Sequence, residues 1–292
     1  MNNTGYLKGK TVFITGGSRG IGFAIAKKLA ADGANIAIAA RSVELKQDPN
    51  AIENETIFTA AKKIEEAGGR CLPCQVDVRN EQQIQSALEK TAQTFGGIDI
   101  VINNCSYLNL TNVGNTDIQK YDEMFRIITR GAYLVCKLSY PYLKKSNHAH
   151  ILNISPPINL DPVWLELHAA YTAFKFSVSM YTIGMSKEFK KDNIAVNSLW
   201  PKKVIYSSGM IEHRGPKARK FCRSVDIMAD AAYAILIKDP KVFSGNLNLD
   251  EDVLKNENIH DMGQYSEAGA IEEKILPDVF VGEVPNFDVI NE

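Results

Sequence analysis

Short hydrophobic segments rich in β-branched residues alternate along the chain with longer segments whose hydrophobic positions recur every three or four residues. The short segments predict strands, and the longer ones predict amphipathic helices. Strands are expected at residues 11–16, 34–40, 71–78, 98–104, 150–155, 193–200 and 245–250. Helices are expected at residues 20–33, 56–69, 81–97, 117–145, 168–190 and 226–239. This alternation predicts an α/β fold, a doubly wound parallel sheet with right-handed crossovers.

The last part of the chain has a different character. Residues 253–292 are acidic and only weakly periodic. We therefore expect residues 1–252 to form a single domain. Residues 253–292 are expected to form an irregular extension that wraps around this domain rather than a second domain.

The composition fits one large globular domain with a hydrophobic core, because 45% of the 292 residues are hydrophobic and 23% are charged. The net charge of −1 gives no bulk electrostatic attraction to nucleic acid or to an anionic membrane. No stretch approaches the roughly 18 consecutive apolar residues that a membrane-spanning helix needs. The sequence therefore predicts neither a nucleic-acid-binding protein nor a membrane span.

The cysteines are typical of a reduced, intracellular protein, because there are five of them and they form no dense framework. We expect the cytoplasm or, in a eukaryote, an organelle matrix. Cys71 and Cys74 form a CxxC pair, but the pair lies in a predicted strand rather than at a helix start. Two core cysteines are therefore favoured over a thioredoxin-like site. The five histidines are scattered without metal-ligand spacing, so no metal site is predicted.

The first predicted strand runs into TGGSRGIG (15–22), and a predicted helix follows directly. Gly16, Gly20 and Gly22 would let the backbone turn tightly, approach a pyrophosphate closely and pack the helix on the strand. The first N–H groups of the helix and its dipole would then face the phosphates. In this context the pattern favours a dinucleotide-binding site over a purely structural turn.

The chain resembles the short-chain dehydrogenase/reductase family over about residues 8–252, because several motifs occur in the family's order. These motifs are TGGSRGIG (15–22), the Asp77 of VDV, NNCS (103–106), YTAFK (171–175) and PKKV (201–204). The resemblance implies a Rossmann-type fold and a homodimer or homotetramer.

Two longer segments are most similar to the hydroxysteroid dehydrogenase-like type of this family. They are RSVELKQDPNAIENETIF (41–58) and HILNISPPINLDPVW (150–164). Some members of that type carry a C-terminal sterol-carrier domain, which a chain of this length is not expected to hold. Lipid transfer, the function of that domain, is therefore not expected for this chain.

The resemblance also implies how a nicotinamide dinucleotide would be held. Asp77 would bond the adenine amino group, Asn103 would lie beside the cofactor, and the Val204 backbone would meet the carboxamide. The residues expected at the cofactor are Gly16, Ser18, Arg19, Gly20, Ile21, Gly22, Arg41, Asp77, Val78, Asn103, Tyr171, Lys175, Pro201 and Val204.

The end of the second predicted strand indicates which dinucleotide is preferred. NAD-binding folds place an acidic side chain there for the ribose hydroxyl, whereas NADP needs a cation. This chain has Ala40 at that position, followed by Arg41, and Arg19 lies in the glycine turn. Both arginines could be simply solvated, but together they favour charge-assisted bonds to the 2′-phosphate of NADP.

Tyr171 and Lys175 in AYTAFK lie on one face if the segment is helical, one turn apart. By resemblance, the tyrosine exchanges a proton with the substrate oxygen during hydride transfer. The lysine lies nearby, lowers the pKa of the phenol by its charge and bonds the nicotinamide ribose. A phenol with an ordinary pKa of about 10 would be a poor base at neutral pH. The pair therefore predicts an oxidoreductase that interconverts a carbonyl and a secondary alcohol.

Two supporting positions of the family's catalytic group depart from its pattern. Ile128 stands where an asparagine is expected, and an isoleucine cannot hold the water that relays protons from the lysine. Pro156 stands where a serine is expected. The adjacent Ser155 could reach the substrate oxygen instead, although two prolines fix the backbone after it.

These departures leave a second function open, a dinucleotide-binding protein with weak or no catalysis. The retained Tyr171–Lys175 pair argues against it. The substrate, a small carbonyl or alcohol, is not identified by the sequence. Residues 202–223 carry seven cations against Glu212. They could either balance the acidic end of the chain or attract an anionic substrate.

Overall fold

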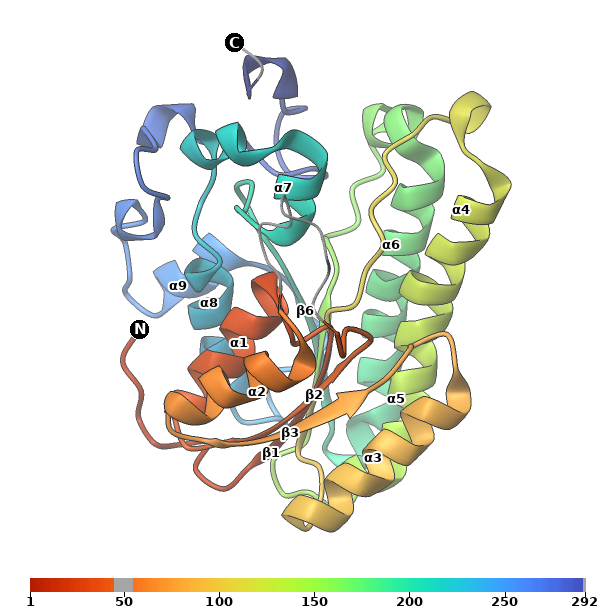
Figure 1. Cartoon of the computed structure of the whole chain (residues 1–292), viewed down its shortest axis with the longest axis vertical. Coiled ribbons are helices and arrows are strands. Elements are labelled where there is room, and N and C mark those ends of the chain that lie inside the picture. The colour runs from red at the N-terminus through yellow and green to blue at the C-terminus, as the bar shows by residue number, and fades with distance from the viewer. Residues whose placement is uncertain (45–54, 291–292) are drawn as a thin grey trace.

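A central parallel sheet lies between two layers of helices in the computed structural model, which describes residues 1–44 and 55–290 (Figure 1). Within these residues the sheet has seven strands in the order β3-β2-β1-β4-β5-β6-β7. The strands are β1 Thr11–Thr15, β2 Asn35–Ala40, β3 Arg70–Gln75, β4 Ile100–Asn103, β5 His150–Ile154, β6 Ala195–Trp200 and β7 Leu247–Leu249. The predicted Rossmann-type, doubly wound sheet is confirmed.

The helices cover both faces of the sheet. They are α1 Gly20–Ala31, α2 Ile57–Glu66, α3 Glu81–Phe95, α4 Ile118–Met124, α5 Ala132–Leu143, α6 Pro162–Glu188, α7 Ser208–Arg214, α8 Asp226–Leu236 and α9 Asp250–Asn256. Figure 1 shows α1, α2 and α8 on one side and α3, α5 and α6 on the other. Because successive side chains of a strand point to opposite faces, each strand contributes to both layers of the core.

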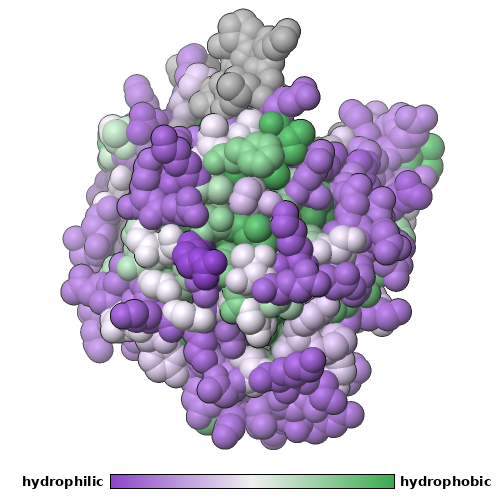
Figure 2. Space-filling model, turned by 60° about the horizontal axis from the view of Figure 1, so that its bottom comes forward, coloured by the Kyte–Doolittle hydropathy of each residue, from purple (hydrophilic) through white to green (hydrophobic). Residues whose placement is uncertain are grey.

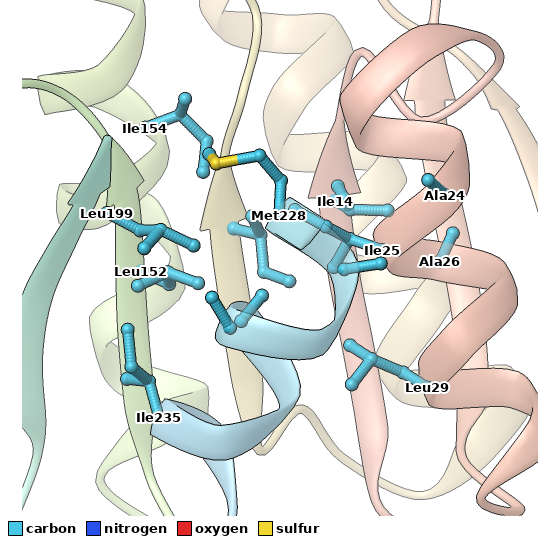
Figure 3. Close-up of a cluster of buried hydrophobic side chains, with 14 of the residues drawn as sticks. Ile14, Ala24, Ile25, Ala26, Leu29, Leu152, Ile154, Leu199, Met228 and Ile235 are labelled. Carbon is cyan, nitrogen blue, oxygen red and sulfur yellow. The ribbon is translucent and has the colours of Figure 1, made fainter. Parts of the chain in front are cut away.

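Hydrophobic side chains fill the space on each face. Ile14 of β1 belongs to the cluster beneath α1 and α8, whereas its neighbour Phe13 belongs to the cluster beneath α3 and α5. Figure 3 shows Leu29 of α1 and Met228 of α8 pointing toward the strands on the first of these faces. The nearly continuous hydrophobic runs of the strands are therefore explained by burial on both faces.

Helix α6 begins six residues before the predicted start, at Pro162 instead of residue 168. Asp161 caps it by accepting a hydrogen bond from the Val163 N–H at 3.1 Å. Pro162 costs no hydrogen bond there, since the first N–H groups of a helix have no partner within it. At His168 the backbone leaves helical geometry, with φ −159° and ψ 61°. The sequence analysis found only the part after this kink.

The helix predicted over residues 117–145 is divided by a π-helical stretch. Residues Phe125–Gly131 adopt this wider geometry between α4 and α5. The stretch contains Ile128, and a π-helical insertion is often found next to a functional site.

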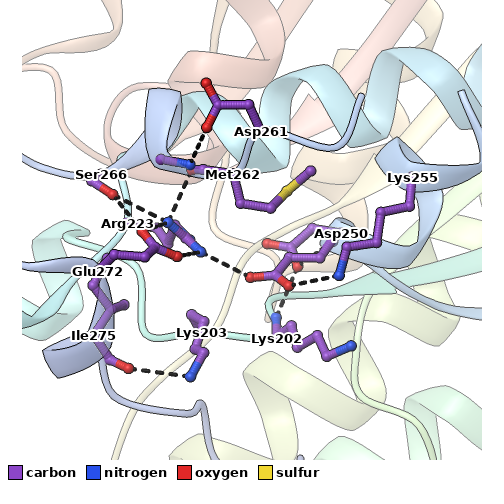
Figure 4. Close-up of polar contacts among 12 residues, drawn as sticks. Lys202, Lys203, Arg223, Asp250, Lys255, Asp261, Met262, Ser266, Glu272 and Ile275 are labelled. Atoms are coloured by element: carbon purple, nitrogen blue, oxygen red, sulfur yellow. Dashed lines mark hydrogen bonds and ion pairs between the residues drawn. The ribbon is translucent and has the colours of Figure 1, made fainter. Parts of the chain in front are cut away.

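After α9 the chain continues over the body in short 3-10 turns and irregular segments to residue 290. Arg223, just before α8, is only 1% exposed and anchors this C-terminal segment. It forms ion pairs with Glu251 at 3.1 Å and Glu272 at 2.5 Å, and it donates to the Met262 carbonyl oxygen at 2.9 Å. Figure 4 shows this network, which joins four separate parts of the chain.

No helix in residues 1–44 and 55–290 is both long and apolar enough to cross a membrane. The face of the molecule in Figure 2 is largely hydrophilic and carries one hydrophobic patch in its upper part. Of the residues placed in the structure, no three His, Cys, Asp or Glu side chains are grouped so that they could hold a metal ion.

Candidate active site

The turn after β1 can be built only with glycine at several positions. Gly16 and Gly20 have φ of 67° and 56°, in the left-handed region that favours glycine. A Cβ atom on Gly22 would lie 2.4 Å from the Gly16 carbonyl oxygen, which is too close for any other residue. The backbone therefore turns at Gly16 and Gly20 and packs closely at Gly22, as predicted.

Asn104 fixes this turn from the neighbouring strand, a role that sequence analysis missed. Its side-chain amide donates to the carbonyl oxygens of Thr15 at 3.1 Å and Gly16 at 3.0 Å. The Thr15 hydroxyl in turn accepts from the backbone N–H groups of Asn104 at 3.1 Å and Cys105 at 3.2 Å. The sequence signal for this role is the second asparagine of NNCS, because the resemblance assigns a function only to the first, Asn103.

Among the described residues, no side chain caps the first N–H groups of α1. Its N-cap residue, Arg19, has an extended backbone and makes no capping hydrogen bond with its side chain. The first N–H groups of a helix without such a cap can bind a phosphate. Ser18 is buried beside the turn and Ile21 is half-buried. Together with the glycine cradle, this geometry fits the pyrophosphate of a dinucleotide.

Arg19 also connects the glycine turn to α7. Its guanidinium lies 3.1 Å from the Glu212 carboxylate, and both side chains are substantially exposed. An ion pair in water contributes little stability, so a phosphate could compete for this guanidinium. Arg41 is exposed at the end of β2. Both predicted cations therefore lie next to the carboxyl edge of the sheet.

Asp77 is already engaged by Arg79, which the sequence analysis did not single out. The Arg79 Nε donates to both Asp77 oxygens, at 2.9 and 3.0 Å. These bonds, with the charges of Arg79 and Arg41, hold the pKa of Asp77 below its ordinary value. Asp77 is thus a charged acceptor next to the buried Val78, and an adenine amino group would share it with Arg79.

Asn103 is buried and donates to the Asn153 side-chain oxygen at 2.8 Å. Its own side-chain oxygen has no hydrogen-bond partner among the described residues, so one acceptor remains available next to the site. Pro201 and Val204 are buried. The Val204 N–H donates to the Leu276 carbonyl oxygen at 3.0 Å, and its carbonyl accepts from Arg223 at 2.8 Å. The predicted contact of Val204 with a carboxamide would have to replace or share one of these bonds.

Tyr171 and Lys175 lie one turn apart on α6, as predicted, and each is only 4% exposed. The Lys175 ammonium donates to the Ile154 carbonyl oxygen at 3.0 Å and lies 4.9 Å from the centre of the Trp200 ring. Ser106 of NNCS acts on the Tyr171 phenol in the direction that lowers its pKa. The end of β5, the NNCS motif and α6 thus converge on this pair.

The electrostatics of the pair differ from the sequence expectation. Burial raises the pKa of Tyr171 well above its ordinary value, and the charge of Asp278 adds to this effect while Ser106 opposes it. Burial lowers the pKa of Lys175 to about 8, with Asp278 acting in the opposite direction. Burial thus dominates at the phenol, and the lowering of its pKa by the charge of Lys175 stays a prediction.

Ser155 is fully buried, and its hydroxyl accepts a hydrogen bond from Ser179 of α6 at 3.2 Å. Its contact with the substrate oxygen stays a prediction. Ser106, which is exposed, opposes the rise in the pKa of Tyr171. Ile128 is 2% exposed and belongs to the hydrophobic core, so this position offers no polar group for a relay water.

Cys71 and Cys74 lie in β3, where Cys71 is half-buried and Cys74 is buried. Burial raises the pKa of Cys71 to about 12 and raises that of Cys74 as well. A reactive cysteine needs a lowered pKa, so the structure supports the interpretation as core residues.

Three of the seven cations in residues 202–223 form ion pairs with acidic residues between 251 and 272. Lys202 pairs with Asp252 at 2.9 Å, Arg219 pairs with Glu267 at 2.9 Å, and Arg223 pairs with Glu251 and Glu272. These ion pairs favour the first of the two interpretations and weaken the case for an anionic substrate.

Comparison with known proteins identifies a family and relatives that this chain is similar to. The family model described as short chain dehydrogenase matches residues 10–214. The chain is 53% identical to the Hydroxysteroid dehydrogenase-like protein 2 of Xenopus tropicalis and 52% identical to that of Homo sapiens. Both matches span 283 residues and cover 97% of this chain. They cover 66% of each relative, so the chain spans slightly less than two thirds of their length.

Among solved structures, a short chain dehydrogenase from Mycobacterium thermoresistibile is similar in both sequence and fold. It is 39% identical, with a TM-score of 0.87, and the match covers 95% of this chain and 96% of the other. The similarity extends well beyond residue 214, so the C-terminal part of the fold is included.

Proposed function

Because this chain belongs to the short-chain dehydrogenase family, we propose that it is an NADP-dependent oxidoreductase that interconverts a carbonyl and a secondary alcohol. The observation that carries the proposal is the convergence of Tyr171 and Lys175 on the edge of the sheet where the glycine turn lies. A dinucleotide bound on that turn would supply or accept a hydride at the carbonyl carbon.

The chain's own residues then supply the proton. In the reductive direction the O–H bond of Tyr171 breaks, and its proton moves to the carbonyl oxygen of the substrate. The raised pKa of Tyr171 keeps the phenol protonated at neutral pH, which is the form that donates. Lys175, which donates to the Ile154 carbonyl oxygen, places a buried cation one helical turn away.

The preference for NADP rests on Arg19 and Arg41, with no acid at Ala40. We expect NADPH to bind more tightly than NADH. Arg41→Asp should reverse or flatten this preference, because it removes a charge-assisted bond that contributes about 1.5–3 kcal/mol. Titration of both cofactors by fluorescence measures the two dissociation constants.

Lys62→Asp is the matched control for this charge reversal, because Lys62 is exposed on α2 and has no predicted role at the cofactor. Its ratio of dissociation constants should equal that of the unmodified protein. Equal affinities for NADPH and NADH in the unmodified protein would contradict the assignment of NADP.

A dinucleotide-binding protein with weak or no catalysis is the second candidate. It is favoured by the burial of Ile128 in the core and by the engagement of Ser155 with Ser179. Turnover of a panel of ketones in the presence of NADPH separates the two candidates, since a binding protein would hold NADPH without oxidising it.

We also propose a homodimer or homotetramer assembled through α4, α5 and α6. Tyr133 of α5 and Met180 and Ile183 of α6 are 46%, 63% and 42% exposed. Hydrophobic side chains gathered on one exposed face are typical of an interface. The double change of Met180 and Ile183 to Glu should therefore lower the sedimentation coefficient at micromolar concentration.

Val242→Glu is the control, because Val242 is 82% exposed after α8 and outside the proposed interface. This variant should sediment like the unmodified protein. A monomer before any substitution would contradict the proposed assembly.

Within this proposal, residues 1–252 are the catalytic domain and residues 253–292 are an extension without a core of its own. Ile290 packs in a small cluster with Val204, Ala218 and Cys222, so the end of the described chain shares the core of the body. We place the protein in the cytoplasm or an organelle matrix, in keeping with its five free cysteines.

A further inference from the structure

Phe280 of the C-terminal segment lies directly against the catalytic tyrosine. Its ring is stacked on that of Tyr171, with centroids 6.2 Å apart and an interplanar angle of 17°. The ring also meets the edge of His168 at 5.7 Å and the face of Trp200 at 6.0 Å, at 48°. Phe280 is only 2% exposed, although it lies about 110 residues beyond Tyr171 in the sequence.

Four hydrogen bonds hold this part of the segment at the site. Two join the backbone of residues 276 and 278 to that of residues 204 and 202, at 3.0 and 3.1 Å. The Trp200 indole donates to the Val279 carbonyl oxygen at 3.1 Å, and Asn159 donates to the Phe280 carbonyl oxygen at 3.3 Å. The segment is thus bound both to the end of β6 and to the loop before α6.

The backbone of Phe280 is strained. Its φ is 73°, in the left-handed region that bulky residues rarely adopt. Such strain persists only where the surroundings fix it, and it is concentrated at functional sites. Here the surrounding rings of Trp164, Phe176 and Trp200 fix the position of the Phe280 ring.

We propose that Phe280 is a specificity-determining residue, which forms the aromatic wall of the substrate site and selects carbonyl compounds with a compact, uncharged, apolar body. This inference rests on the proposed function. The substrate oxygen must reach the Tyr171 hydroxyl, and the Phe280 ring is stacked on the ring that carries this hydroxyl. The adjoining body of the substrate must then lie beside the ring that covers the face of Tyr171.

The chemistry around Phe280 supports an uncharged substrate. Trp164, Phe176 and Trp200 contribute aromatic surface to the same cluster. Three of the seven cations that follow β6, Lys202, Arg219 and Arg223, pair with acidic residues. An aromatic wall favours an apolar body over an anion.

The test compares a compact ketone, cyclohexanone, with a bulky bicyclic ketone, 2-decalone, at saturating NADPH. Phe280→Ala should lower kcat/KM for cyclohexanone about tenfold and raise it for 2-decalone about tenfold. The ratio of the two constants would then change about 100-fold. Phe287→Ala is the matched control, since Phe287 lies in the same segment against Arg214 and its ratio should stay within twofold of the unmodified protein.

A ratio that stays within twofold in Phe280→Ala would overturn the inference while leaving the proposed function intact. Unmodified protein that binds NADPH and reduces neither ketone nor any other in the panel would overturn the proposed function and the inference together. If circular dichroism shows that Phe280→Ala is unfolded, Phe280→Leu takes its place in the test. It keeps an apolar side chain without the ring, and its ratio should change at least threefold, whereas an unchanged ratio overturns the inference.

Discussion

Tyr171→Phe should remove carbonyl reduction while leaving NADPH binding intact. The substitution deletes only the hydroxyl that donates the proton, and general acid catalysis contributes about 10²- to 10⁴-fold to a rate. We expect kcat to fall by at least about 1,000-fold. The dissociation constant of NADPH should change less than about twofold, because the ring remains to stack on Phe280 and to meet His168.

The fold should tolerate this substitution. The substitution keeps the whole ring, so the packing of the ring against Phe280 and His168 is retained. Tyr181→Phe is the matched control, because Tyr181 lies on the same helix and its ring contacts Tyr133 instead of the site. Its kcat should equal that of the unmodified protein. If Tyr171→Phe retains more than half of the unmodified rate, another group supplies the proton.

The fold was predictable because its signals are local. Each strand of the sheet is a short hydrophobic run, and the turn after β1 needs glycine where glycine occurs. Tyr171 and Lys175 were found by their spacing on one helix, and the helix brings them together as expected. Such features depend on neighbours a few residues away, so a single sequence reveals them.

The remaining parts of the site depend on contacts between distant residues. Ser155 was expected to reach the substrate oxygen, but the sequence did not indicate that its hydroxyl would be buried and bonded to Ser179 of α6. Asp278 and Phe280 come from a segment without periodicity, so no local pattern indicated that they would lie beside Tyr171. The raised pKa of Tyr171 follows from the burial that these distant residues produce.

The same dependence on distant contacts predicts that Arg223→Met strongly destabilises the protein. Arg223 is 1% exposed, and Glu251, one of its two acidic partners, is 6% exposed. Methionine fills a similar volume but leaves the buried Glu251 with Lys255, at 3.4 Å, as its remaining ion-pair partner among the described residues. Removing one partner of a buried ion pair costs about 3–5 kcal/mol. We expect the free energy of unfolding in urea to fall by about this amount.

Arg219→Met is the control that distinguishes burial from the mere loss of a charge. Arg219 is paired with Glu267 at 2.9 Å, but its side chain is 52% exposed. An exposed ion pair contributes about 0–1 kcal/mol, so this variant should unfold close to the unmodified protein. Equal free energies of unfolding for the two variants would show that the Arg223 network does not hold the C-terminal segment.

Arg223→Met should also loosen the segment that carries Phe280 before the sheet unfolds, because Glu272 loses its buried ion-pair partner. The rate of amide hydrogen exchange should then rise first at residues 276–280, which are hydrogen-bonded to the backbone of residues 202 and 204.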